Sequence, residues 1–264
     1  MNNMKNNILS KVAYYYFPVM ILFLGFCACE NKEAKNEIKK EEVSKEKPKK
    51  KQEINLQDVL LSNENVTDIL TQYGEQNPET IVIISTSIGD IKVRLYKETP
   101  LHRANFIRLA KKKYFDGTVF HRVIEGFIVQ GGGFDEPRAS VGKYTIPSEI
   151  KSELLHKRGA LAMAREYKDN PNKRSAFHDF YIVQTLKMSL PELQATAIEH
   201  KLKLTPLQTK IYTTLGGAPH LDNEHTVFGE VIEGMDVVDK IAKVKTDKGN
   251  WPITDIEIRM KVVE

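Results

Sequence analysis

The residues best suited to chemistry gather in one short stretch. Within residues 120–133, Arg122 and Gln130 bring hydrogen-bonding groups close in sequence to the apolar Phe127 and Ile128. An arginine side chain is always charged, and its planar head carries several donors in fixed directions. Taken one at a time, Arg122 has the simpler interpretation of a charge on a strand surface, and the two apolar residues that of core packing. A function must therefore come from the pattern that they form together.

The histidines and cysteines give weaker signals. His121 alone is typical of a hydrogen-bonded structural histidine. His220 with His225 suggests a metal, but no further ligands converge with them in the sequence, so no metal site is predicted. The two cysteines, Cys27 and Cys29, both lie near the N-terminus. This excludes a disulfide framework or a cysteine metal site in the rest of the chain.

Residues 120–133 read FHRVIEGFIVQGGG, which resembles the family pattern of the cyclophilins. That pattern is Phe-His-Arg, two apolar residues, any residue, Gly-Phe, two apolar residues and Gln-Gly-Gly, and every specified position matches without a gap. The resemblance runs from about residue 80 to the C-terminus. It includes Thr99-Pro100, Asn105-Phe106, Leu221-Asp222 and residues 161–164, 180–183 and 227–229. It implies a mostly β fold, a closed eight-stranded antiparallel barrel capped by two helices, and peptidyl-prolyl cis–trans isomerase activity.

Isomerisation explains why such residues are needed. The bond before a proline rotates on the order of tens to hundreds of seconds, because the amide resists twisting. An isomerase must bind the twisted amide better than either planar form, and this requires neither a covalent step nor a cofactor. Twisting exposes a lone pair on the prolyl nitrogen, and the resemblance implies that Arg122 donates to it. It also makes Phe127 and Gln130 members of the catalytic group, with Gln130 orienting Arg122.

The resemblance also implies a substrate-binding pocket around this group. The pocket residues are His121, Ile128, Met163, Ala164, Arg165, Asp179, Tyr181, His220, Leu221 and His225. Four of these positions depart from the family. Asparagine is usual in place of Arg165 and glutamine in place of Asp179. Phenylalanine is frequent in place of Tyr181, and tryptophan or another aromatic residue in place of His220.

The departures at Arg165 and Asp179 raise a question about Arg122. A carboxylate at Asp179 could clamp the Arg122 guanidinium through two hydrogen bonds. Our hypothesis is that Arg165 and Asp179 pair with each other instead and leave Arg122 available. His220, at the rim of the pocket, would make it less apolar and sensitive to pH near neutrality.

Short strands must position these residues. Apolar runs and alternation predict strands at residues 81–84, 91–95, 119–124, 127–130, 161–164, 180–184, 226–231 and 253–262. Many short strands with few helices indicate a closed antiparallel barrel. Thr99-Pro100 predicts a helix start with Thr99 as N-cap, and residues 237–241 predict a late helix.

Further helices are predicted outside the strands. Residues 59–73 predict a helix in an N-terminal extension at 55–79. Two capping boxes, which start at Ser189 and Thr205, predict helices at 190–202 and 206–215. These two helices would form a hairpin in an insertion at 185–217 of an isomerase domain that spans 80–264.

The N-terminal segment predicts where in the cell the protein is located. Residues 1–28 have the form of a secretory signal, with basic residues before an apolar run. Ala28 before Cys29 resembles a bacterial lipoprotein signal, so Cys29 is the predicted site of lipidation. A plain signal peptide or an uncleaved anchor is the alternative. Residues 29–54, rich in lysine and glutamate, predict a flexible tether. We therefore expect a membrane-anchored lipoprotein of the cell envelope, on the periplasmic face or the cell surface.

Composition limits the partners. The formal net charge is only +4, with both signs mixed, so no nucleic acid is expected. The expected partners are proline-containing polypeptides, the expected state is a monomer, and the expected function is isomerisation of exported proteins or peptides. The alternative is a proline-peptide binding or chaperone module that has lost most catalysis. The intact Arg122, Phe127 and Gln130 favour the first, whereas the altered residues 177–179 favour the second.

Overall fold

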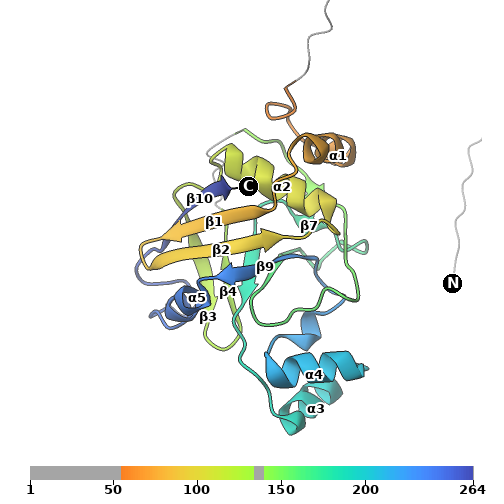
Figure 1. The fold of residues 1–264 in the computed structure, drawn as a ribbon, viewed down its shortest axis with the longest axis vertical. Helices are drawn as coiled ribbons and strands as arrows, with labels where there is room; N and C mark the ends of the chain where they lie inside the picture. Colours follow the sequence, from red (N-terminus) through yellow and green to blue (C-terminus); the bar gives the residue numbers. More distant parts are fainter. Residues whose placement is uncertain (1–54, 134–139, 264) are drawn as a thin grey trace, which may run out of the picture. The chain divides into compact units, whose positions relative to one another are not determined.

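Short runs of β-branched and aromatic residues pair into eight strands that close into an antiparallel barrel (Figure 1). The computed structural model describes residues 55–133 and 140–263. In order around the barrel, the strands are β1 (Ile81–Thr86), β10 (Glu257–Val263), β3 (Thr118–Ile124), β4 (Ile128–Gly131), β8 (Phe180–Val183), β6 (Ala160–Met163), β9 (Val227–Glu233) and β2 (Gly89–Leu95), which closes on β1. The predicted fold class is confirmed.

Strands β6 and β8 are buried along their whole length, because both of their faces are covered. On β8, Phe180 and Ile182 belong to the barrel core, whereas Tyr181 and Val183 belong to a second apolar cluster on the other face. Such two-sided burial produces the continuous apolar run Phe-Tyr-Ile-Val rather than an alternation with polar residues. The second cluster matters for function, since it lies outside the barrel core.

Helices α2 (Pro100–Lys111) and α5 (Met235–Ala242) correspond to the two predicted caps. Thr99 is the N-cap residue of α2, as predicted, but its side chain makes no capping hydrogen bond. The carboxylate of Glu149 takes that role, because it accepts from the backbone N–H groups of Leu101 and His102 at 3.0 and 2.9 Å. A carboxylate at a helix N-terminus also interacts favourably with the helix dipole.

The N-terminal extension contains a shorter helix than predicted. Helix α1 spans Val66–Gln76 and lies beside α2 (Figure 1). The predicted start at residue 59 is wrong, since residues 59–65 form turns and a single bridge. The cause is Arg108 of α2, whose fully buried guanidinium donates to the carbonyls of Leu56, Gln57 and Val59 at 3.4, 3.0 and 2.5 Å. A helix at 59 would withdraw the Val59 carbonyl into its own ladder.

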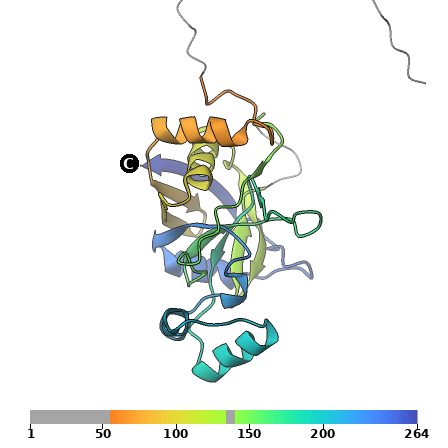
Figure 2. The same ribbon diagram turned by 90° about the vertical axis from the view of Figure 1, so that its right-hand side faces the viewer.

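The insertion forms two helices, α3 (Leu190–Glu199) and α4 (Pro206–Thr214). Both predicted capping boxes are present, so both helices begin where predicted and end slightly earlier. The hairpin lies at the end of the barrel opposite α1 (Figures 1 and 2). The smaller elements are β5 (Thr145–Ile146), β7 (Ser175–Ala176) and the 3₁₀ turn η1 (Pro219–Leu221).

Part of the chain stays outside this description. The predicted signal at 1–28, the tether at 29–54 and the lipidation site Cys29 lie outside the described residues. Among the helices of residues 55–133 and 140–263, none has the length and apolar character that a membrane crossing requires.

Candidate active site

The Arg122 guanidinium and the Gln130 amide lie opposite each other on neighbouring strands. Arg122 on β3 pairs in register with Gln130 on β4, and its Nη1 donates to Oε1 of Gln130 over 3.4 Å. A register shift between Phe120 and Arg122 marks a β-bulge. The bulge lets Phe120 and Val123 both enter the barrel core while Arg122 keeps the face it shares with Gln130. The β-bulge therefore determines the face of the sheet from which the Arg122 side chain projects.

The row continues across the next two strands. Gln130 is opposite Tyr181 on β8, and Tyr181 is opposite Ala162 on β6. Around this row lies the second apolar cluster. Its buried members are Ile128, Ala160, Ala162, Tyr181, Val183, Ala218 and Val227, and Tyr96, Phe127, Leu154, Ala164 and Leu221 pack against it half-buried. Five predicted site residues therefore meet here: Phe127 of the catalytic group, and Ile128, Ala164, Tyr181 and Leu221 of the pocket.

The rim of this cluster is a stack of three rings. His220 stacks on Phe127 at a centroid distance of 5.4 Å and on His200 at 4.8 Å. His200 is the C-cap residue of α3, so the insertion contributes a ring that the sequence did not assign to the site. Burial, and then the neighbouring His200, lower the pKa of His220. The ring is therefore neutral at neutral pH.

His225 contacts Tyr181, with the two rings edge-on at a centroid distance of 5.7 Å. Its Nδ1 donates to the Met163 carbonyl over 3.3 Å, and its Nε2 accepts from the Tyr167 hydroxyl over 2.7 Å. Burial lowers the pKa of His225 to about 4, so its ring is neutral at neutral pH. Tyr167 was missed from the sequence, because an exposed tyrosine in the loop after β6 belongs to no motif.

His156 was also missed, although it is the hydrogen-bond partner of Tyr181. It is fully buried, and its Nε2 lies 3.1 Å from the Tyr181 hydroxyl oxygen. Its Nδ1 lies 3.1 Å from Oδ1 of Asp222. Only the contacts in space reveal this residue, since no spacing in the sequence connects 156 with 181 or 222.

The predicted Arg165–Asp179 pair is wrong. Arg165 binds Glu224 instead, with Nη2 2.7 Å from Oε2 and Nε 2.7 Å from the Glu224 carbonyl oxygen. Asp179 accepts from Nδ1 of its neighbour His178 over 3.0 Å. The physical reason is proximity: Glu224 offers Arg165 both a carboxylate and a backbone acceptor at once. The Arg122 guanidinium donates to Gln130, and no hydrogen bond or ion pair among the described residues joins it to Asp179.

Two further predicted pocket residues lie outside the second apolar cluster. Met163 is fully buried in the barrel core, on the face of β6 opposite to Ala162. His121 falls in the β-bulge, with its ring 5.8 Å from Trp251. Its Nδ1 is buried without a hydrogen-bond partner among the described residues, and burial lowers its pKa.

Steric overlap explains why two of the residues that follow Gln130 are glycines. Gly132 has a φ of 111°, and a Cβ there would overlap the carbonyl oxygen of His178. A Cβ at Gly133 would overlap the Asp179 carboxylate. Glycine alone lets the chain pass this close to residues 178 and 179.

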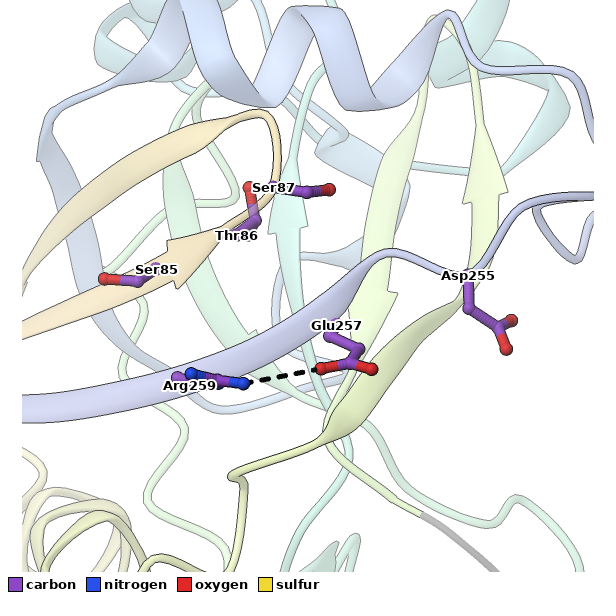
Figure 3. A pocket seen from close by; sticks show the side chains of 6 residues that line it. All are labelled: Ser85, Thr86, Ser87, Asp255, Glu257 and Arg259. Carbon is purple, nitrogen blue, oxygen red and sulfur yellow. Dashed lines mark ion pairs between the residues drawn. The ribbon is translucent and has the colours of Figure 1, made fainter.

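Several cavities among the described residues lie away from the Arg122–Gln130 pair. One, of about 460 Å³, is lined by polar and charged side chains of β1, β10 and their flanks (Figure 3). Those residues are Ser85, Thr86, Ser87, Asp255, Glu257 and Arg259, and none is a predicted site residue. Another, of about 680 Å³, borders His178 and includes Arg174 and Phe177.

The comparisons with known proteins agree with this geometry. The family model "Cyclophilin type peptidyl-prolyl cis-trans isomerase/CLD" matches residues 81–262. A Streptococcus pyogenes protein named as a bifunctional phosphatase/peptidyl-prolyl cis–trans isomerase is 36% identical over 183 residues, which cover 67% of this chain and 37% of that protein. The chain thus spans little more than a third of that relative.

Two other relatives match over nearly their full length. A Staphylococcus saprophyticus protein named as a peptidyl-prolyl cis–trans isomerase is 33% identical, with 74% of this chain and 100% of that protein covered. The crystal structure of a Cryptosporidium parvum cyclophilin in the presence of the dipeptide Ala-Pro has a TM-score of 0.51 and 27% identity, with 70% of this chain and 99% of that chain covered. The chain therefore belongs to the cyclophilin family, and it is a peptidyl-prolyl cis–trans isomerase.

Proposed function

We propose that this isomerase aims the Arg122 guanidinium at the prolyl nitrogen of a twisted X-Pro bond. The observation that carries the proposal is the bond from Arg122 Nη1 to Gln130 Oε1, 3.4 Å long, on the face that bears the apolar cluster. That bond uses one N–H group of a head that has five, and it fixes the plane of the head. Further donors then point from a defined position toward a bound substrate.

The chemistry follows from where the nitrogen lone pair is. In a planar amide the nitrogen lone pair is delocalised into the carbonyl. In the twisted amide the lone pair stays on nitrogen, where it can accept a hydrogen bond. A fixed donor thus stabilises the transition state more than either ground state. A charge-assisted hydrogen bond in apolar surroundings contributes about a hundredfold in rate, or about 2.7 kcal/mol.

The proline ring is proposed to bind against Phe127, Tyr181 and Leu221. Its pyrrolidine carbons carry no charge, so an apolar surface suits them, and two of these three residues are only half-buried. The relative whose structure was determined in the presence of Ala-Pro supports proline-containing peptides as substrates.

An isomerisation assay with an alanyl-prolyl peptide tests the mechanism. Arg122→Ala is expected to lower kcat/KM about a hundredfold. The matched control is Arg94→Ala, because Arg94 lies on β2 with a 53% exposed side chain and a single surface ion pair to Glu230. The control is expected to retain full activity. Equal activity of the two variants would remove Arg122 from the mechanism.

The alternative function is a proline-peptide binding module with little catalysis. The observation that favours it is Asp179, which pairs with His178 where the family usually has a glutamine. Titration of the same peptide onto the wild-type protein separates the two possibilities. Binding without a measurable rate enhancement would support the module, whereas a rate enhancement that depends on Arg122 supports the enzyme.

We also propose that the protein is a lipoprotein of the cell envelope that acts on exported polypeptides. The support for this proposal is that Cys29 follows an apolar run and is directly preceded by the small residue Ala28. Cys29→Ala is expected to release the protein from the membrane fraction, and Cys27→Ala is expected to leave it there. Retention of both variants would indicate an uncleaved anchor, and release of wild-type protein a plain signal peptide.

A further inference from the structure

The helical insertion reaches the apolar cluster through a series of hydrogen bonds. On α4, the Tyr212 hydroxyl donates to Oδ2 of Asp222 over 2.5 Å, and Gln208 Nε2 donates to the same oxygen over 3.0 Å. The other oxygen, Oδ1, accepts from the backbone N–H and the Nδ1 of His156 at 2.9 and 3.1 Å. His156 Nε2 lies 3.1 Å from the Tyr181 hydroxyl.

The protonation states of these buried groups determine which atom donates and which accepts in each hydrogen bond. Tyr212 and His156 are fully buried, and the Asp222 side chain is 5% exposed. Burial alone would raise the pKa of Asp222, but the hydrogen bonds from His156 and Tyr212 lower it, so the carboxylate is ionised. Burial lowers the pKa of His156, so its ring is neutral. A neutral ring that donates from Nδ1 accepts at Nε2, and Tyr181 is therefore the donor.

This arrangement holds Tyr181 at both ends. Its backbone is paired between β4 and β6, opposite Gln130 and Ala162. Its hydroxyl is held by His156, whose ring also stacks on it at 6.1 Å. A tyrosine has two side-chain torsions, so a fixed hydroxyl leaves the ring one position. The insertion thereby influences the ring next to the Arg122–Gln130 pair.

We propose that the α3–α4 insertion positions the isomerase site, with Tyr212 and Asp222 holding His156 so that His156 fixes the Tyr181 ring beside the substrate. Tyr212, Asp222 and His156 are positioning residues, because only Tyr181 would touch the substrate. The inference rests on the proposed placement of the proline ring against Tyr181.

A double-mutant cycle in the full chain tests the coupling. Tyr212→Phe removes one hydroxyl and keeps the buried ring, and we expect it to lower kcat/KM for an alanyl-prolyl peptide about fivefold, mainly by raising KM. In a Tyr181→Phe background the series is already broken. There, Tyr212→Phe is expected to change kcat/KM by less than about 1.5-fold, because its effect acts through the Tyr181 hydroxyl.

Tyr144→Phe is the matched control. Tyr144 is also a buried tyrosine, and its hydroxyl donates to Asn105 Oδ1 over 2.7 Å. We expect this control to lower the melting temperature as Tyr212→Phe does and to leave kcat/KM unchanged. The same fold-loss from Tyr212→Phe in both backgrounds would overturn the proposal. If Tyr212→Phe does not fold, Gln208→Leu, which removes the other donor to the same oxygen, replaces it in the cycle.

The outcome is distinguishable from a failure of the proposed mechanism. If Arg122→Ala abolishes activity while Tyr212→Phe has no effect, only the positioning role is wrong. If Arg122→Ala retains activity, the mechanism is wrong, whatever the cycle gives. Coupling between positions 212 and 181 together with an inactive Arg122→Ala variant supports both.

Discussion

Arg165 and Glu224 form an ion pair in which Nη2 lies 2.7 Å from Oε2, and the Arg165 side chain is only 5% exposed. Glu224 also accepts from Lys173 Nζ over 2.8 Å, so one carboxylate holds two cations. Arg165 further lies over the Tyr167 ring at 4.2 Å. The charge introduced at 165 is thus neutralised by residues other than Asp179.

This arrangement predicts that Asp179 has little influence on catalysis. Asp179→Gln is expected to change kcat/KM by less than about twofold, because the Arg122 guanidinium bonds to Gln130 and the Asp179 carboxylate to His178. The measurement is the alanyl-prolyl isomerisation assay at low ionic strength, where charge effects are largest. A strong gain in activity would mean that the carboxylate inhibits Arg122 in solution.

Gln130 is expected to matter more. Gln130→Leu removes the acceptor that fixes the Arg122 head, and kcat/KM should fall about tenfold while the melting temperature changes little. The matched control is Gln57→Leu, because Gln57 is also half-buried and donates to a single backbone carbonyl, that of Arg108, over 3.1 Å. Similar kinetic losses in both variants would contradict the orienting role.

The buried His225 predicts a loss of stability in acid. Its pKa is about 4 in the folded protein, against about 6.5 in an unfolded chain. Between these values only the unfolded chain takes up the proton, so a falling pH favours unfolding until the pH reaches about 4. The full effect corresponds to about 3 kcal/mol. Urea unfolding at several pH values should give a steeper decline for wild type than for His225→Asn, whereas parallel curves would contradict the shift.

His220 predicts how substrate affinity depends on pH. Because burial and then His200 lower its pKa, the ring is neutral at neutral pH, and the affinity for a proline peptide should be constant from about pH 7 to pH 8. Below that, protonation places a charge against Phe127, and we expect the affinity to fall. His220→Phe should remove this fall. A fall in acid that persists unchanged in His220→Phe would exclude His220 as its source.

The barrel could be predicted because its signals are local. The alternating Ile91, Val93 and Leu95 of β2 each bury one side of a strand, and all eight predicted strands occur. Residues 253–256 were assigned to the last strand, yet β10 begins at Glu257. The apolar Ile253 made the predicted strand too long, although its side chain is 69% exposed and belongs to no buried face.

The site was predictable only where the family motif covers it. Phe127, Ile128 and Gln130 follow from contiguous sequence. Ile128 and Gln130 lie two residues apart on β4 and so share the face of the second cluster. His156 and Tyr212 reach Tyr181 through contacts between distant segments, which a single sequence does not encode as a pattern. Arg165 was paired with the wrong carboxylate for the same reason, because charge complementarity alone does not choose between two acids.

The two buried arginines of α2 have a consequence for the boundary of the folding unit. Arg103 donates to the carbonyls of Gly74 and Asn77, and Arg108 to those of Leu56 and Gln57, so both cations find their acceptors before residue 80. A fragment trimmed to the family match at residue 81 would lose these carbonyl acceptors together with helix α1, which packs against α2. We therefore expect the segment that matches the family to be less stable by itself than a fragment that begins at residue 55, which keeps α1 and these hydrogen bonds.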